Sequence, residues 1–413
     1  MKLGIDFGTT NSAVAVAGAG GVPRILELIP GEPIQRTVIH CDPDGVVRFG
    51  NAAFRSYEEH DLQGRFLRSL KAFLPQEVPR LTLGPERLDF HQIVGYYLRF
   101  LLERTEAVTG QRPSEVIVGR PVRFHADPEK DAFALKQLEQ ALAFAGITDW
   151  RLQMEPVAAA HLYERGLDAE RLVLVGDFGG GTSDFAILRV GPQRLGQDRA
   201  EDVLGTSGVA KAGDALDGRF MEAFLMEYFG RGAGYRARYT DEIKTWNHSA
   251  TRHIKKLYDV HRLRTPTLEM QLDRIEDRMV NPTIIRRLRR LIFDDLGFPM
   301  AWAIEATKRE FSESERTTFQ FVEFYSKEMN IAREVDRDTF AAESAAILAE
   351  YDGAIDEVLD VAGLTVADID EVFLTGGTSQ LPFIRGIFAT RFGADRLRHA
   401  DAFSSVCAGL ALS

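Results

Sequence analysis

The sequence predicts a mixed α/β protein built from two similar lobes. The chain opens with a strand, a glycine-rich turn and a second strand over residues 3–16. The same pattern returns at residues 172–188, where an Asp-Phe-Gly triplet beginning at Asp177 repeats the one beginning at Asp6. Because an internal repeat of this kind is typical of a duplicated structural unit, we expect each lobe to begin with one glycine hairpin.

The other elements follow from the periodicity of the apolar residues. Residues 115–120 read as a strand that ends before Pro121, and residues 129–145 as a helix. Glu155 and Pro156 open a further helix, whose run of alanines allows close packing. Farther along, the sequence predicts a mostly helical segment at 217–337, a strand at 372–375, a glycine turn at 376–377 and a helix from residue 382.

The composition excludes several classes of protein. Of the 413 residues, 45% are hydrophobic and 27% are charged, and the 2 cysteines are Cys41 and Cys407. So few cysteines exclude a disulfide scaffold and indicate a reducing compartment. No stretch resembles a signal peptide or reaches the ~18 uninterrupted apolar residues of a membrane span. A net charge of −11 argues against nucleic-acid binding. We therefore expect a cytoplasmic protein that binds neither membrane nor nucleic acid.

Charge is distributed unevenly along the chain. Between residues 231 and 310, basic residues outnumber acidic ones, and the densest run is the arginine-rich stretch 286–290. Apolar residues at helical spacing in this stretch predict an amphipathic helix with a solvated basic face. The alternative is a docking surface for an acidic protein partner.

The two hairpins have the chemistry of a phosphate site. Glycines let the backbone bend tightly and approach a ligand, and consecutive N–H groups in such a turn form a concave anion site. Hydroxyls of Thr9, Thr10 and Thr182 add donors for phosphate oxygens. Asp6 and Asp177 would repel a phosphate unless a divalent cation lay between, so they predict Mg²⁺ held by carboxylates and water.

Other phosphate loops continue differently after their glycines. In a P-loop or a dinucleotide fingerprint, the glycines lead into a helix. Here they lead into a strand, and no G-x-x-x-x-G-K-[ST] string occurs. Asp-Phe-Gly is also found in protein kinases, but the other kinase motifs are absent from this sequence.

The motifs resemble those of the DnaK-type heat-shock-70 chaperones. Residues 4–12 and 177–184 resemble the two phosphate loops of that family, and Glu155-Pro156 with its alanines resembles a motif near its hinge. The remaining motifs of the nucleotide site are resembled by residues 212–217, 305–312 and 376–382. The matches run in family order over the whole chain, and the nearest resemblance is to the YegD-like branch, which has little beyond the ATPase domain.

The resemblance implies a two-lobe, actin-like ATPase fold, with the nucleotide in a cleft between duplicated RNase H-like lobes. Lobe I would cover residues 1–168, with its core in 1–35 and 114–168 and an insert at 36–113. Lobe II would cover residues 169–413, with its core in 169–216 and 338–413 and a helical insert at 217–337.

Carried over residue by residue, the resemblance also implies the site. Catalysis would involve Lys71, Glu155, Asp177, Thr182 and Asp184. Lys71 would face the γ-phosphate, and Glu155 and Asp184 would position the attacking water or take its proton. Asp6 and Asp177 would orient the waters around Mg²⁺. The residues implied to bind ATP or ADP are Gly8, Thr9, Thr10, Asn11, Gly179, Gly180, Gly181, Thr182, Gly213, Asp214, Glu305, Lys308, Arg309, Ser312, Gly376, Gly377, Thr378 and Gln380.

Several of these residues also have a purely structural interpretation. Lys71, and likewise Lys308 with Arg309, would then be solvated charges on helix faces. Glu155 would be a carboxylate that stabilises the N-terminus of its helix.

Two departures from the family pattern shape the functional expectation. Gln380 stands where the family has an arginine that stacks on adenine, and the family's peptide-binding domain has no counterpart in the sequence. We therefore expect a slowly ATP-hydrolysing, nucleotide-dependent switch that acts on a protein partner, with a monomer favoured. The alternatives are an ATP-binding module without turnover, a small-molecule kinase of the same superfamily and a filament-forming actin relative.

Overall fold

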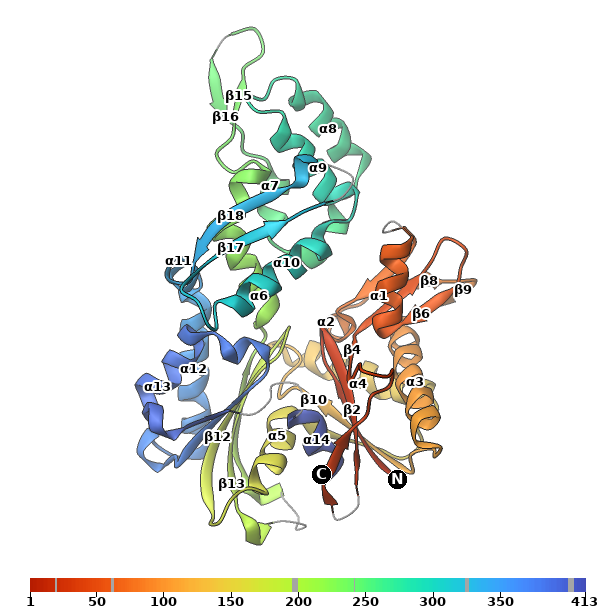
Figure 1. Ribbon diagram of the computed structural model, residues 1–413, viewed down its shortest axis with the longest axis vertical. Coiled ribbons are helices and arrows are strands. Elements are labelled where there is room, and N and C mark those ends of the chain that lie inside the picture. The colour runs from red at the N-terminus through yellow and green to blue at the C-terminus, as the bar shows by residue number, and fades with distance from the viewer. Residues whose placement is uncertain (19–20, 61–62, 195–199, 241, 324–326, 400–404) are drawn as a thin grey trace. The chain divides into compact units, whose positions relative to one another are not determined.

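The computed structural model describes residues 1–18, 21–60, 63–194, 200–240, 242–323, 327–399 and 405–413, whose elements are labelled in Figure 1. The chain forms two compact units. The first comprises Met1–Gly213, Glu350–Ser379 and Ile384–Ser413, and the second comprises Asp214–Ala349 and Gln380–Phe383. The lobe boundaries implied by the resemblance stay a prediction.

The first unit contains two sheets, and the first of these is built around β1. Its strands are β1 (Lys2–Phe7), β2 (Asn11–Ala17), β3 (Pro23–Ile25), β4 (Ile34–Arg36), β10 (Glu115–Arg120) and β11 (Trp150–Met154). The strand order is β11-β10-β1-β2-β3, and β4 also pairs with β2. β1 pairs antiparallel with β2 and parallel with β10. Leu3, Ile5 and Phe7 alternate along β1 and are fully buried, as expected for one face of a central strand.

The second sheet repeats this arrangement around β12. Its strands are β12 (Arg171–Phe178), β13 (Ser183–Val190), β14 (Val203–Val209), β19 (Glu371–Thr375) and β20 (Leu397–His399). The order is β14-β13-β12-β19-β20, with β12 antiparallel to β13 and parallel to β19. Each sheet thus has a glycine hairpin at its centre and parallel strands on one side of it. The predicted α/β fold with a duplicated unit is confirmed.

Two helices of the first unit pack closely against each other, and each also packs on strands of a sheet. They are α5 (Glu155–Glu164), which packs on β12 and β13, and α14 (Ser405–Leu412), which packs on β1 and β2. A Cβ added at Gly409 of α14 would lie 1.7 Å from the carbonyl oxygen of Ala158 in α5. A Cβ added at Gly4 would lie 2.5 Å from the backbone nitrogen of Ala411. The predicted close approach of the alanine-rich helix is therefore present, and small residues on both helices permit it.

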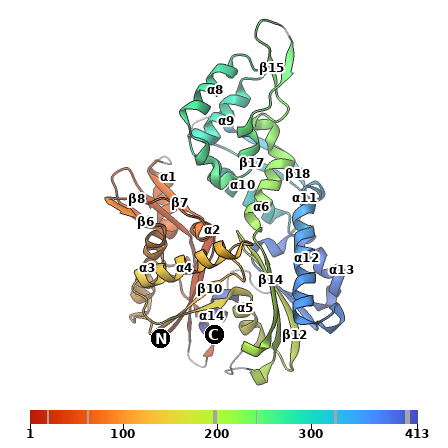
Figure 2. The ribbon, with the colours of Figure 1, turned by 180° about the vertical axis from the view of Figure 1, so that it is seen from behind.

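A smaller subdomain follows β4 and ends in a long helix. Its elements are β5 (Val38–Cys41), β6 (Val47–Phe49), α1 (Gly50–Glu59), β7 (Arg65–Arg68), α2 (Leu70–Phe73), β8 (Leu81–Leu83), β9 (Glu86–Leu88) and α3 (Phe90–Thr109). Asp89 and Gln92 form a capping box at the start of α3, and Gly110 ends the helix with a left-handed φ of 71°. α3 lies beside α4 (Pro128–Phe144), as both views of the ribbon show (Figure 1, Figure 2). Asp127 caps α4 and Pro128 stands in its first turn, which explains where this predicted helix begins.

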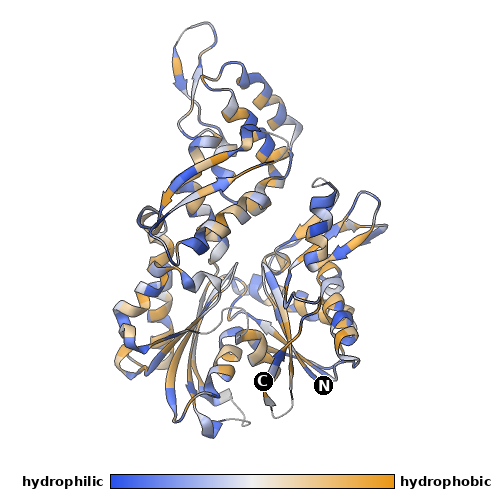
Figure 3. Cartoon of the chain, viewed as in Figure 1, coloured by the Kyte–Doolittle hydropathy of each residue, from blue (hydrophilic) through white to orange (hydrophobic). Residues whose placement is uncertain are grey.

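Helices α12 (Ala345–Ala362) and α13 (Pro382–Phe392) cover one face of the second sheet. Phe178 of β12 makes edge-to-face ring contacts with Tyr351 and Phe388, which belong to these two helices. Ser207 of β14 donates a hydrogen bond to the carbonyl oxygen of Ala354 at 2.7 Å. In Figure 3 the strands of this sheet are mostly apolar, in keeping with burial on both faces.

The second unit is mostly helical and also carries short strands that the sequence did not predict. Its helices are α6 (Gly213–Phe220), the π-helical turn η4 (Met221–Leu225), α7 (Ser249–His253), α8 (Pro266–Glu276), α9 (Thr283–Phe293), α10 (Gly297–Glu310) and α11 (Arg337–Glu343). The strands form two antiparallel pairs, β15 (Gly234–Arg236) with β16 (Ile243–Thr245) and β17 (Arg316–Phe321) with β18 (Ile331–Asp336). Phe220 anchors the core of this unit through ring contacts with Phe311, Phe319 and Phe340.

Short 3-10 helices complete the two units. They are η2 (Pro192–Arg194), η3 (Ala200–Asp202), η5 (Met226–Phe229), η6 (Leu257–Leu263), η7 (Lys327–Met329), η8 (Val366–Asp368), η9 (Gly377–Gln380) and η10 (Ala394–Arg396). Among all the helices in the described ranges, none combines the length and the apolarity needed to cross a bilayer.

The arginine-rich helix α9 is amphipathic, as predicted, but its arginines are engaged within the second unit. Arg286 pairs with Glu276 at 2.7 Å, and Arg289 pairs with Asp273 at 2.6 Å. Arg290 pairs with Glu323. Arg287 donates to the carbonyl oxygen of Glu328 and lies over the ring of Tyr228. These contacts partly neutralise the basic face that we expected to be solvated. Whether it also docks an acidic partner stays a hypothesis.

Candidate functional site

The tips of the two glycine hairpins meet within the first unit. Gly8, Thr9 and Thr10 form the first turn, and residues 179–182 form the second, which is closed by a 3.0 Å hydrogen bond from Gly179 N–H to the carbonyl oxygen of Thr182. A Cβ added at Gly181 would lie 3.0 Å from Oγ1 of Thr9. A side chain at residue 181 would therefore crowd Thr9, and a ligand bound beside the two turns could contact both.

The other residues of the two turns fix the conformation of the backbone there. A Cβ at Gly8 would lie 2.3 Å from the carbonyl oxygen of Asn11, so this turn also requires a glycine. Asn11 begins β2 and pairs with Arg36, while the carbonyl oxygen of Thr10 accepts a hydrogen bond from Thr37 N–H. Gly180 lies at the tip of the second turn.

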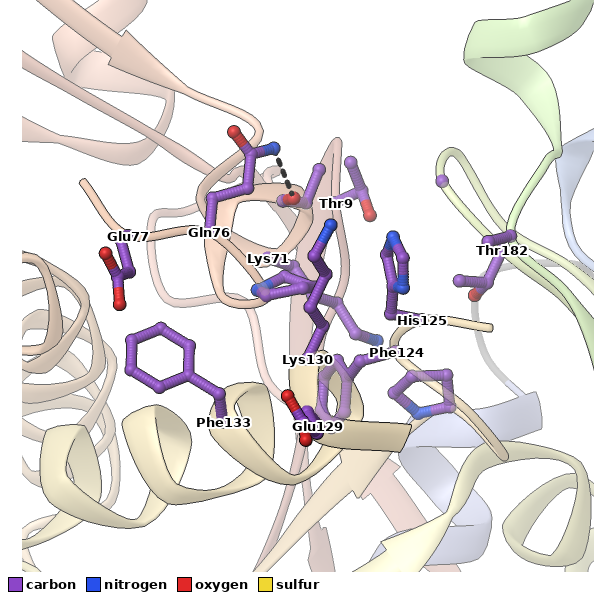
Figure 4. A pocket seen from close by; sticks show the side chains of 15 residues that line it. Thr9, Lys71, Gln76, Glu77, Phe124, His125, Glu129, Lys130, Phe133 and Thr182 are labelled. Atoms are coloured by element: carbon purple, nitrogen blue, oxygen red, sulfur yellow. Dashed lines mark hydrogen bonds between the residues drawn. The ribbon is translucent and has the colours of Figure 1, made fainter. Parts of the chain in front are cut away.

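A pocket of about 800 Å³ opens beside both turns (Figure 4). Its lining includes Thr9, Gly181 and Thr182 from the hairpins and Lys71 from α2. Pockets of this size are typical of small-molecule sites.

Lys71 forms a buried ion pair with Glu155. The two side chains are 7% and 8% exposed, so Lys71 is not a solvated lysine on a helix face. Burial alone would lower the pKa of the Lys71 ammonium, but the carboxylates of Glu155 and Asp6 outweigh burial and raise it. Ser69, two residues before Lys71, has a left-handed φ of 51°, an uncommon conformation for a residue other than glycine.

The carboxyl groups around this ion pair outnumber the cations. Burial, together with the charge of Glu155, raises the pKa of Asp6 to about 7. The same two causes raise the pKa of Asp184 to about 7 and that of Asp177 well above its ordinary value. Asp184 is held in place by a 2.6 Å hydrogen bond from Val122 N–H. A site with this excess of carboxyl groups calls for an additional positive charge.

The residues present fit a magnesium ion held partly through water. Within the described parts of the chain, no three His, Cys, Asp or Glu side chains are grouped closely enough to enclose a metal directly. Mg²⁺ usually keeps several waters and binds one or two carboxylates together with substrate phosphates. Asp6 and Asp177 lie at equivalent ends of β1 and β12, just before the two turns, and are suited to that role.

A third glycine turn lies next to the second hairpin. Gly376 has a φ of +84°, and a Cβ there would lie 2.1 Å from the carbonyl oxygen of Phe178. Gly213 N–H donates to the carbonyl oxygen of Gly179 at 3.2 Å, and a Cβ at Gly213 would lie 3.2 Å from Oγ1 of Thr378. Gly213, Gly376 and Thr378 are therefore gathered around one hairpin, with Gly377 beginning η9.

The other residues implied to bind adenosine belong to the second unit. Lys308 of α10 forms a nearly buried ion pair with Asp217 of α6. Glu305 and Arg309 pair with each other at 2.5 Å across one helical turn, and Ser312 donates to the carbonyl oxygen of Arg309. Asp214 lies in the first turn of α6 and Gln380 at the end of η9. Lys308 is thus no solvated charge, whereas Arg309 is exposed.

Comparison with known proteins identifies the family. The family model described as "Hsp70 protein" matches residues 77–258 and 299–413. The chain belongs to the Hsp70 family. The segment between the matched parts contains α8 and α9, the arginine-rich helix.

Curated relatives of this Hsp70-family chain include DnaK chaperones. It is 24% identical to "Chaperone protein DnaK" of Thermotoga neapolitana over 99% of this chain and 58% of the relative. It is 25% identical to the DnaK of Thermus thermophilus, over 99% of this chain and 60% of the relative. It is 24% identical to the DnaK of Halobacterium salinarum, over 99% of this chain and 55% of the relative. The chain thus spans less than two-thirds of the length of these relatives. The homology supports a nucleotide-binding ATPase domain of the chaperone type.

The sequence did not single out the outer wall of the pocket in this Hsp70-family chain. That wall consists of Ala72, Pro75, Gln76, Glu77, Pro121, Phe124, His125, Glu129, Lys130, Phe133 and Ala210. One signal was available, because residues 121–125 follow directly on β10. Ligands in α/β proteins bind beyond the carboxyl ends of parallel strands, and β10 is parallel to β1.

Proposed function

We propose that this chain binds Mg·ATP through its two glycine hairpins and hydrolyses it slowly. The observation that carries the proposal is the position of Lys71, which is buried against Glu155 and lines a pocket that both hairpins border. A fixed cation beside two phosphate loops is suited to stabilise the negative charge that develops when a phosphoryl group is transferred.

Lys71 can serve a phosphate without giving up its partner. An ammonium group has three N–H donors, and the contact with Glu155 uses one of them. The remaining donors are available to the terminal phosphate, while Glu155 keeps the side chain in a single position. The ammonium of Lys71, which lines the pocket, would thus be held in position before any ligand arrives.

Asp184 is the side chain best suited to take a proton from the attacking water. Burial and the charge of Glu155 raise its pKa above that of an ordinary carboxyl group, which makes it a stronger base. The hydrogen bond from Val122 N–H fixes one of its oxygens. Bound Mg²⁺ would supply positive charge to the phosphates, with Asp6 and Asp177 holding its water ligands.

We further propose that ATP turnover works as a conformational switch for a protein partner. Thr9 of the first hairpin and Thr182 of the second line the same pocket, so a single triphosphate could contact both. Loss of the terminal phosphate would remove part of that contact and shift the population of conformations. The chemistry of the partner stays undefined.

ATP hydrolysis by a Lys71→Ala variant tests the proposed chemistry. We expect phosphate release to fall by about 100-fold or more, because an electrostatic contact made to the reacting group is lost. Lys136→Ala is the matched control, since Lys136 is exposed on α4 and does not line the pocket. Equal rates in the native chain and the Lys71 variant would reject the assignment.

The alternative of ATP binding without turnover is favoured by Gln380, which replaces the arginine expected to stack on adenine. ATP binding without turnover would raise the melting temperature in the presence of Mg·ATP, and no phosphate would be released over hours.

A further inference from the structure

The pocket beside the hairpins extends beyond the two turns and Lys71. Its inner part is formed by Thr9, Lys71 and Thr182, and one side of its outer wall comes from the loop before α4 and the first turns of that helix. The adenosine-site residues of the same unit, Gly213, Gly376, Gly377 and Thr378, do not line it. The outer part therefore has room for something other than the nucleoside.

Hydrogen bonds fix His125 so that its Nε2–H can donate to a ligand in this pocket. Its Nδ1 accepts a hydrogen bond from Asp127 N–H at 2.9 Å, so in the neutral ring the proton is on Nε2. The backbone N–H groups of Phe124 and His125 both donate to Asp131 Oδ1, at 2.6 and 3.3 Å. The ring is thus fixed from its backbone side and borders the pocket (Figure 4).

Lys130 adds a positive charge to the same wall. It stands on the first turn of α4 and lines the pocket together with His125. Among the residues that the structure describes, it forms no ion pair. In Figure 4 the side chain of Lys130 overlaps that of Lys71 and His125 lies toward Thr182, whereas Glu77 and Phe133 border the opposite side.

We propose that His125 and Lys130 form an outer phosphate subsite, which holds orthophosphate after its bond to ADP is broken. This rests on the proposed function. Orthophosphate near neutral pH carries one or two negative charges and has oxygens on all sides. Lys71 and the hairpins can serve its inner oxygens, while Nε2–H of His125 and the ammonium of Lys130 serve its outer ones.

The carboxylates of the pocket limit where this anion can bind. Glu77 and Glu129 also line the outer part and repel it. The subsite is therefore confined to the inner side of the wall, next to the hairpins. Release of orthophosphate must pass these carboxylates, so His125 and Lys130 would prolong the state with both products bound.

Binding of radiolabelled orthophosphate to the full chain, saturated with Mg·ADP, tests the subsite by equilibrium dialysis. His125→Asn retains an oxygen that can accept from Asp127 N–H but lacks the donor at Nε2, and Lys130→Gln removes the charge. We expect each to weaken orthophosphate binding by about fivefold or more, as for the loss of a charge-assisted hydrogen bond. Glu129→Gln should strengthen it. Lys136→Gln, on the same helix outside the pocket, should match the native chain.

The affinity for Mg·ADP without orthophosphate separates the two proposals. Suppose that Mg·ADP binds equally to the native chain and to all variants. If the variants then also bind orthophosphate as the native chain does, or if the native chain binds no orthophosphate, the subsite is refuted and the proposed function stands. If no adenine nucleotide binds to the native chain, both are refuted. Equal melting temperatures for the native chain, His125→Asn and Lys130→Gln, together with selective loss of orthophosphate binding, support the subsite.

Discussion

Asp184 illustrates how a single buried carboxyl group links stability to pH. Its pKa of about 7 in the folded chain lies above the ordinary value of 3.8, so folding favours its protonated form. The stabilisation is fully present below about pH 4 and is lost as pH rises through about 7. Above that range the buried charge is a constant cost.

We therefore expect Asp184→Asn to become more stable relative to the native chain as pH rises from 4 to 8 in the absence of nucleotide and metal. The asparagine keeps the shape and an acceptor for Val122 N–H but cannot ionise. The gain should be about 2–4 kcal/mol across this range. Melting curves of the two proteins at a series of pH values measure it, and a pH-independent difference would contradict the prediction.

The sequence predicted which residues carry this chemistry, and their environment in the fold could not be predicted from it. Asp6 and Asp177 were found because they occupy the same place in each copy of the hairpin. Their raised pKa values could not be predicted, because these depend on burial and on the charge of Glu155, which is distant in sequence. The sequence left Lys308 either as an adenosine-binding residue or as a solvated charge, and its nearly buried ion pair with Asp217 depends on a segment distant in sequence.

The crossing of α5 and α14 depends on one glycine. A Cβ at Gly409 would lie 1.7 Å from the carbonyl oxygen of Ala158, a contact that only movement of a helix can relieve. We expect Gly409→Ala to lower the free energy of unfolding by about 3 kcal/mol, measured by urea denaturation.

Gly353 provides the matched control for this substitution. It also lies within a helix, α12, but a Cβ there would have no neighbour within 4 Å among the described atoms. Gly353→Ala should therefore be neutral or stabilise by up to about 1 kcal/mol through helix propensity. If both substitutions changed the free energy of unfolding equally, the close contact between α5 and α14 at Gly409 would not explain the loss of stability.

Elements with a strong periodicity of apolar residues or with helix caps were predicted well. Short strands that exist only because they pair with another strand were not predicted. The predicted helix at 129–145 appears as α4, because its apolar spacing and its cap are local features. Strands β15 and β16 were missed because each has only 3 residues, too few to show alternation. They exist because they pair with each other, which no local pattern reveals.

For the molecule as a whole, nucleotide binding should depend on divalent cation. The carboxyl groups at Asp6 and Asp177 oppose a phosphate unless a cation offsets them. At a hundred times its Kd, a ligand adds about 2.7 kcal/mol to stability. We expect Mg·ADP to raise the melting temperature at least about twice as much as the same ADP concentration with EDTA.

The double variant Asp6→Asn, Asp177→Asn is the control for this metal effect. Without the two carboxylates, the difference between Mg²⁺ and EDTA should shrink, and ADP alone should bind more tightly than it binds to the native chain. Identical shifts with Mg²⁺ and EDTA in the native chain would contradict a magnesium role for these residues.

The duplicated hairpins, the strands that flank them and the chemistry of their turns could be predicted, because these features depend on neighbouring residues and on short repeating patterns. The folded chain was needed to show that Gly181 reaches Thr9, that Lys71 is buried against Glu155 and that His125 and Lys130 border the same pocket. The reason is physical: contact distances, burial and pKa values arise between segments far apart in the chain, and nothing local to either segment sets them.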